Sequence, residues 1–219
     1  KLYDELGASN TLYLHAWPSD NELSVDNTHT NIWGGRVNAF LVMQELENED
    51  QLYDIFNRLC SNFSISKNYS YGCFYKDEGS AIGLGVLSRF PLFGKTVHSL
   101  DVRSEAESQP SMRPLLKVFV NVNERPLLLL VNHWKSKSGG AEKSEVWRNF
   151  QESVLAQSFA EYEGKNIPVV ACGDFNRDIL EFRKINGRKL QFNVELRGEN
   201  STLVYSPWYD SGGNLFEPG

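Results

Sequence analysis

Short apolar blocks alternate with polar stretches along this chain, and the blocks predict strands and helices in mixed order. Apolar runs of strand length occur at 11–17, 39–43, 81–87, 115–122, 126–132 and 167–172. The runs at 115–122 and 126–132 lie on either side of a short polar turn at Asn123-Glu124, which predicts a hairpin. Two further segments, 47–59 and 143–162, carry apolar residues on one helical face and predict helices. For the second helix, the predicted apolar face is Trp147, Phe150, Val154, Leu155 and Phe159. This mixture predicts an α/β fold in which helices cover the sheets.

The apolar run at 167–172 has no period-two alternation, which favours a strand that is buried on both faces. It ends in Gly173-Asp174-Phe175-Asn176, where the glycine allows a tight exit that exposes Asp174 and Asn176 together. One interpretation is a site carboxylate with a carboxamide beside it. The other is an Asx turn, in which both side chains cap their own backbone.

Three predicted strands end in side chains that can handle a phosphate ester. Glu45 follows the strand at 39–43, His133 follows the strand at 126–132, and Asp174 and Asn176 follow the run at 167–172. A hard cation such as Mg²⁺ prefers oxygen ligands and is often held by one or two carboxylates with water and substrate phosphate. Asp174 can orient or deprotonate an attacking water. His133 and Asn176 can bind the charged equatorial oxygens of an in-line transition state.

Composition and charge exclude several other classes. The 219 residues suffice for one substantial core, so we expect a single domain over 1–219. No apolar run approaches the roughly 18 residues that a bilayer-spanning helix needs, so we expect no membrane span. A net charge of -6 argues against broad attraction to nucleic acid or anionic membranes, although a local basic rim stays compatible with it. Because the chain begins at Lys1, removal of an upstream targeting segment is an open alternative.

The three cysteines are Cys60, Cys73 and Cys172. Cys172 lies in the apolar run before Gly173, where a small core residue is the favoured interpretation. Cys60 and Cys73 flank a polar loop, and two alternatives stay open for them. One alternative is a disulfide between them, formed in an oxidising compartment, and the other is two free thiols.

Four landmarks of the sequence together resemble a known family. In order, they are Gln44-Glu45, Ser88-Arg89-Phe90-Pro91, Asn132-His133 with Lys135-Ser136-Lys137, and Gly173-Asp174-Phe175-Asn176. In this order and spacing they resemble the endonuclease/exonuclease/phosphatase superfamily of metal-dependent phosphoesterases, over about residues 11–219. The resemblance implies a four-layer α/β sandwich, in which two β-sheets pack face to face and are flanked by helices.

The resemblance also implies a role for each matching residue. It implies Glu45 as a ligand of Mg²⁺, with Mn²⁺ as the alternative ion. It implies three catalytic residues, which are the phosphate-side His133, the water-orienting Asp174 and its transition-state partner Asn176. Arg113, which precedes a predicted strand, and Lys135 are the candidate substrate contacts.

Two departures from the family pattern stand out. The first strand of such proteins usually ends in Trp-Asn, whereas Trp17 is followed here by Pro18, which has no side-chain amide. Asn27 is a candidate substitute from the following loop. The family also closes with an Asp-His pair, and none of the four histidines here has a neighbouring Asp. We therefore expect a member that is truncated or divergent at its C-terminus and lacks its last strands.

The hypothesis that follows is a Mg²⁺-dependent phosphodiesterase, nuclease-like, acting on a phosphate ester such as DNA or RNA. Lys135 and Lys137 favour a nuclease, whereas the acidic net charge weighs against tight duplex binding. The alternatives are a phosphomonoesterase or lipid phosphodiesterase of the same superfamily, and a degenerate, non-catalytic binding member. Similarity to secreted or periplasmic nuclease-like members favours that localisation.

Overall fold

The computed structural model describes residues 40–63, 69–100, 109–185, 194–206, 208–209 and 214–215. The described residues up to His133, together with Val170–Asp174, form a first compact unit. Those of Trp134–Val169 and those from Phe175 onward form a second compact unit. The predicted strand at 11–17, with Pro18 and Asn27, lies outside the described residues. The single domain over 1–219 stays a prediction.

The first sheet of the first unit is antiparallel and has three strands. β3 (Gly83–Ser88) lies at its centre, between β1 (Phe40–Leu46) and β2 (Tyr71–Tyr75). Every residue of β3 is buried, as its continuous apolar sequence predicts. The strand predicted at 39–43 is longer than expected, because Gln44 and Glu45 lie within β1 rather than after it.

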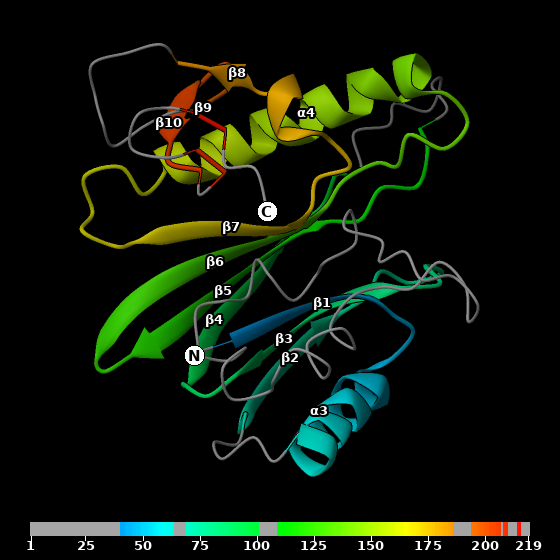
Figure 1. Ribbon diagram of the computed structural model, residues 1–219, viewed down its shortest axis with the longest axis vertical. Helices are drawn as coiled ribbons and strands as arrows, with labels where there is room; N and C mark the ends of the chain where they lie inside the picture. Colours follow the sequence, from blue (N-terminus) through cyan, green and yellow to red (C-terminus); the bar gives the residue numbers. More distant parts are fainter. Residues whose placement is uncertain are drawn as a thin grey trace. The chain divides into compact units, whose positions relative to one another are not determined.

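Helix α3 (Glu49–Phe63) covers one face of this sheet and contacts all three strands (Figure 1). The helix starts after Asn48, whose side chain accepts a hydrogen bond of 3.0 Å from the backbone N–H of Gln51. Its Leu52 is fully buried in a cluster with Leu46 and Leu87. The helix predicted at 47–59 is therefore confirmed, with both ends displaced toward the C-terminus.

The second sheet of the first unit contains the hairpin that the sequence predicts most clearly. Its strands, in order, are β4 (Leu92–His98), β5 (Leu115–Val122), β6 (Arg125–His133) and β7 (Val169–Asp174). Val122 pairs with Arg125, so only Asn123 and Glu124 form the turn between β5 and β6. Both turn residues have positive φ, 51° and 68°, as the type I′ turn of a two-residue hairpin requires.

The two sheets of the first unit pack face to face and enclose its main core (Figure 1). β3 faces β6, and β2 faces β4. The core side chains come from both sheets and are Cys73, Leu84, Val86, Leu116, Val118, Val120, Leu129, Val131 and Cys172. The predicted α/β sandwich built on two β-sheets is confirmed.

The second unit combines a long helix with a small antiparallel sheet. Helix α4 (Ala141–Ala160) confirms the helix predicted at 143–162. The sheet has the order β10-β9-β8 and contacts α4 through its first two strands (Figure 1). The remaining elements are the 3-10 helix η3 (Ile179–Glu181), β8 (Arg183–Lys184), β9 (Val194–Leu196) and β10 (Thr202–Val204). Among the described residues, no helix is both long and apolar enough to cross a membrane.

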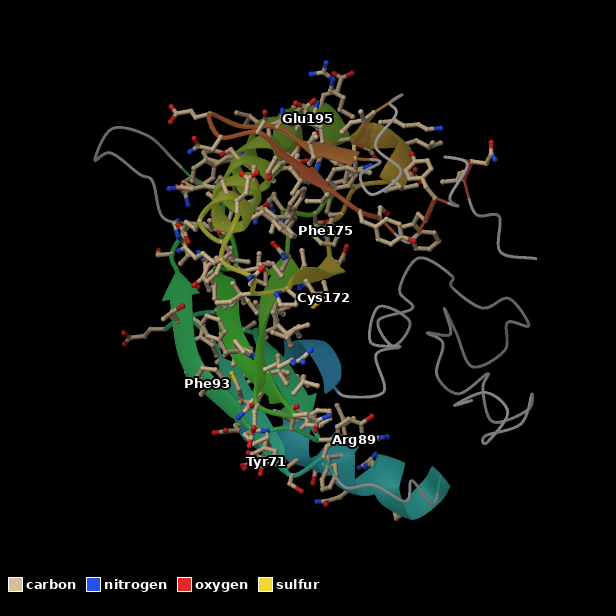
Figure 2. All side chains as sticks on the ribbon, turned by 90° about the vertical axis from the view of Figure 1, so that its left-hand side faces the viewer. Tyr71, Arg89, Phe93, Cys172, Phe175 and Glu195 are labelled. Atoms are coloured by element: carbon tan, nitrogen blue, oxygen red, sulfur yellow. The ribbon has the colours of Figure 1, made fainter. Side chains whose placement is uncertain are left out.

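Several strands are not predicted by the hydrophobic pattern. β4 is an edge strand whose middle residues are exposed, so it lacks an apolar run. Its Phe93, which is labelled in Figure 2, is 48% exposed. The Phe93 ring stacks on Phe119, with the ring centroids 5.2 Å apart. β2 and the short strands β8, β9 and β10 are likewise absent from the sequence prediction, because strands of two to five residues give too little periodicity.

The prediction that the run at 167–172 is buried on both faces is wrong. The strand β7 begins at Val169, and Cys172 is its only buried residue. β7 is less buried than expected because it is an edge strand of its sheet and has a neighbouring strand, β6, on one side only.

Cys73 and Cys172 are free, buried thiols. The alternative of a disulfide between Cys60 and Cys73 is therefore wrong, and the interpretation of Cys172 as a core residue is confirmed. Burial raises the pKa of the Cys172 thiol to about 12, and burial also raises the pKa of Cys73. Both side chains are thus protonated at neutral pH and lack the reactive thiolate.

We expect the Cys60→Ser variant, which keeps only Cys73 and Cys172, to resist alkylation by iodoacetamide at pH 8. Both thiols should react after unfolding in guanidinium chloride, as peptide mass spectrometry would show. The double variant Cys60→Ser/Cys172→Ala is the matched control, because it should show one alkylated thiol after unfolding instead of two. Rapid modification of Cys172 in the folded protein would contradict the burial of this side chain.

Candidate active site

The last residues of β6 and β7, His133 and Asp174, lie together at one edge of the second sheet. β6 and β7 are neighbouring strands, and the two side chains approach to 3.9 Å between Nε2 of His133 and Oδ2 of Asp174. The His133 side chain is 5% exposed, whereas that of Asp174 is 26% exposed. The distance exceeds that of a direct hydrogen bond. A water or substrate oxygen about 2.8 Å from each atom could bridge them.

Asn176 belongs to the second unit, and its conformation is set by a contact distant in sequence. Its Nδ2 donates a hydrogen bond of 3.0 Å to the backbone carbonyl of Trp134. Its φ is 46°, in the left-handed region that asparagine tolerates better than most residues. The Asx-turn interpretation does not describe this bond, because the acceptor lies 42 positions away.

The residues next to His133 and Asp174 in the chain form an aromatic cluster in the second unit. The rings of Trp134 and Phe175 meet edge to face, with centroids 5.0 Å apart. Phe182 packs against both rings. Trp134 and Phe175 directly follow the last residues of β6 and β7 in the chain, so the cluster joins the two segments that come after these strands.

The segment after Trp134 is held to helix α4 through its backbone. The N–H of Lys135 donates to Oε1 of Gln151 at 2.7 Å, and its carbonyl accepts from Nη1 of Arg148 at 3.3 Å. The Lys135 side chain is half-buried. Lys137 forms an ion pair with Glu181, so its charge is engaged within the protein.

The face that α4 buries is largely polar, so the predicted apolar face is confirmed only in part. The buried residues are Ser144, Arg148, Gln151, Glu152, Val154, Leu155, Ala156 and Ser158. Of the five predicted residues, only Val154 and Leu155 are among them, and the other three are half-buried. The reason is that the polar side chains have polar partners inside the second unit, which hydropathy alone cannot reveal.

Arg177, which directly follows Asn176, is the main partner of this polar face. Its side chain and that of Glu152 are both fully buried, and its guanidinium is paired with Glu152 and Glu145. It also donates to Oδ1 of Asn149 at 2.9 Å. Arg177 is not among the site residues predicted from the sequence. The available signal was a cation placed directly after the Gly-Asp-Phe-Asn motif.

The other predicted site residues are placed as follows. Glu45 lies in β1 where the pairing with β3 shifts register, between Gln44 and Leu46, and its side chain is not among those described. Such irregularities in strand pairing are frequent beside active sites. Arg113 is half-buried in the segment that enters β5, and this segment lies beside the end of β6 because Leu116 pairs with Val131.

No metal site is evident among the described residues. Among them, no group of three or more His, Cys, Asp and Glu side chains is arranged to hold a metal ion. Mg²⁺ needs as few as one or two protein carboxylates. The partly exposed Asp174 is one such carboxylate, so the described residues are compatible with a hard cation that has few protein ligands.

Comparisons with known proteins identify a family. The model of the Endonuclease/Exonuclease/phosphatase family matches residues 25–191 of this chain. No curated protein sequence matches the chain.

Solved structures with a similar fold match at low identity. The crystal structure of TDP2 from C. elegans is 15% identical, with a TM-score of 0.50, and the match covers 80% of this chain and 54% of that one. Sphingomyelinase C from Streptomyces griseocarneus is 19% identical, with a TM-score of 0.44 and coverages of 64% and 52%. The chain thus spans about half the length of these structures.

We expect Glu181 to contribute stability that is lost in acid. Burial opposes ionisation of this carboxyl, but the hydrogen bonds from Lys137 and from the backbone of Asp178 outweigh it and lower its pKa below 4.5. The lowered pKa means that the stabilisation is present above pH 4.5 and is lost as the pH falls through the folded-state value. Thermal unfolding between pH 7 and pH 3 should therefore depend less on pH in Glu181→Gln than in the unmodified protein.

Glu163→Gln, in the exposed turn after α4, is the control and should keep the original pH dependence. Parallel curves for Glu181→Gln and the unmodified protein would contradict the role assigned to Glu181.

Proposed function

Because this chain belongs to the Endonuclease/Exonuclease/phosphatase family, we propose that it is a divalent-metal-dependent phosphodiesterase that cleaves nucleic acid by in-line attack of water. The observation that carries the proposal is the approach of His133 to Asp174, 3.9 Å apart at the shared end of β6 and β7. A buried imidazole beside a partly exposed carboxylate suits a site that binds a phosphate oxygen and a nucleophilic water together.

Asp174 is the proposed general base. Its carboxylate is 26% exposed, so water can reach it, while the remaining surface is covered by protein. It accepts a hydrogen bond from the attacking water, orients its lone pair toward phosphorus and takes up its proton. His133 is buried and therefore held in one place, from which its Nε2 donates to a non-bridging oxygen of the phosphate.

Asn176 and Lys135 are the proposed contacts to the charged phosphate. The hydrogen bond from Asn176 to the Trp134 carbonyl fixes the plane of the carboxamide. A fixed donor stabilises developing charge without reorganising during the reaction. Lys135 has its backbone held at both N–H and carbonyl by α4, and its half-buried side chain supplies a positive charge. Arg113, in the segment that enters β5, is the second proposed cationic contact.

Glu45 is the proposed metal ligand. A divalent cation held there would neutralise charge on the phosphoryl group, with Mg²⁺ as the proposed ion and Mn²⁺ as the alternative. Beyond that contribution, the proposal assigns binding, orientation and proton transfer to His133, Asp174 and Asn176.

One observation favours a smaller phosphate ester as the second candidate substrate. Lys137 is paired with Glu181 and is therefore less available to a nucleic acid backbone than the sequence suggests. Tight duplex binding rests on several phosphate-neutralising cations, and the chain has a net charge of -6. A phosphomonoester or lipid phosphodiester needs fewer such contacts.

We expect supercoiled plasmid to be cleaved in the presence of Mg²⁺, with phosphorylated inositols and sphingomyelin as the parallel substrates. Asp174→Asn and His133→Gln should each lower kcat by about 10²- to 10⁴-fold, because each removes a group that acts in proton transfer or charge stabilisation. Asp54→Asn, on the exposed side of α3, is the matched control and should leave kcat unchanged.

Calorimetry with Mg²⁺ and Mn²⁺ tests the metal directly, and Glu45→Ala should weaken binding. Turnover of the inositols or sphingomyelin alone would replace the nuclease proposal by its second candidate. If no substrate turned over and Glu45→Ala left metal binding unchanged, the non-catalytic alternative would stand instead.

A further inference from the structure

The turn that carries Asn176 is anchored to helix α4 by one buried side chain, Arg177. Its guanidinium reaches three acceptors, which belong to Glu145, Asn149 and Glu152. These residues are spaced by four and three positions and therefore lie on one face of α4, one turn after another. A planar guanidinium can bridge several acceptors in this way, whereas the compact ammonium group of a lysine cannot reach the same set of acceptors.

Arg177 also contacts the residue to which Asn176 is bonded. Its guanidinium carbon lies 5.6 Å from the centroid of the Trp134 ring, within the range of a cation–π interaction. The carbonyl of Trp134 accepts the hydrogen bond from the Asn176 carboxamide. Asn176 is therefore fixed on both sides, by its own bond to Trp134 and by the anchored side chain that follows it.

The backbone of Asn176 explains why such anchoring is needed. Its φ of 46° is a conformation that non-glycine residues adopt only where their surroundings enforce it, and such residues cluster at functional sites. Phe175, on its other side, is held in the aromatic cluster with Trp134 and Phe182.

We propose that Arg177 is a positioning residue, which acts through its pairing with Glu152, Glu145 and Asn149 to hold the Asn176 carboxamide in place for catalysis. The catalytic consequence rests on the proposed phosphodiesterase function, whereas the positioning itself does not. Arg177 does not contact the reacting atoms in this proposal. It limits the freedom of the donor that does, and small displacements of such a donor can cost about 10²-fold in rate.

Glu152 offers a matched control, because a second arginine binds the same carboxylate. Arg197, at the end of β9, donates from Nη2 to Oε2 at 2.8 Å and from Nε to Oε1 at 3.1 Å. Removing either arginine takes one cation from the buried Glu152. Only Arg177 is adjacent to Asn176, so a positioning role predicts a loss of activity for the Arg177 change alone. A purely structural role predicts similar effects of the two changes on activity.

The experiment compares Arg177→Gln with Arg197→Gln in the complete chain, at a temperature where both are folded. We expect Arg177→Gln to lower kcat at least tenfold with KM changed less than twofold, while Arg197→Gln changes neither more than twofold. The second readout is the side-chain amide resonance of Asn176 in ¹⁵N NMR. It should shift and lose protection from solvent exchange in Arg177→Gln and remain unchanged in Arg197→Gln.

Two further variants keep the test decisive if Arg177→Gln does not fold. Arg177→Lys preserves the charge and should restore part of kcat, because one of the acceptors can still be paired. Asn149→Ala removes one acceptor from an exposed position and should perturb the Asn176 resonance in the same direction.

The outcomes separate this inference from the proposed function. Equal losses of kcat in Arg177→Gln and Arg197→Gln, or an unchanged Asn176 amide in Arg177→Gln and in Asn149→Ala, would overturn the positioning role. If the unmodified protein turned over no phosphate ester, the proposed function would fail and the NMR comparison would still decide whether Arg177 positions Asn176.

Discussion

A fully buried carboxylate, that of Glu152, is the constraint on which the second unit depends. Removing an isolated carboxylate from water is costly, so this side chain can be buried only together with cations that bond to it. Arg177 and Arg197 supply those bonds, and they come from the turn after β7 and from the end of β9. One residue of α4 thereby ties two segments to a single helix face. The other buried polar side chains of α4 have partners of their own, such as the N–H of Lys135 for Gln151 and the carbonyl of Lys135 for Arg148.

The first unit depends instead on apolar packing. Its two sheets enclose side chains such as Val86 and Leu129, which are fully buried, so the strands that carry them have little freedom to slide. β6 and β7 lie side by side in one of these sheets, and their last residues, His133 and Asp174, meet at its edge. The geometry of this pair is thus a consequence of how the core fixes two neighbouring strands.

Local signals predicted much of the fold and the identity of the candidate site residues. The turn at Asn123 and Glu124 is short and lies between two apolar runs, so the hairpin needed no distant information. The edge position of β7 could not be predicted in this way, because it depends on which strand pairs with β6. Arg177 was missed for a similar reason. From the sequence alone, an arginine after Asn176 is expected at the surface. Its burial can be predicted only once its hydrogen-bond acceptors are known, and these lie 25 or more positions earlier in the chain.

The sequence by itself determined the α/β class, the two long helices, the hairpin, the strand-end residues His133 and Asp174, and Asn176 in the turn after them, because each leaves a pattern within about 20 residues. The tertiary structure alone decided which of these side chains meet and which face of α4 is buried. Burial of charge depends on partners rather than on hydropathy. Glu152 and Arg177, fully buried yet among the most polar of side chains, can be placed in the interior only when the folded chain brings them together.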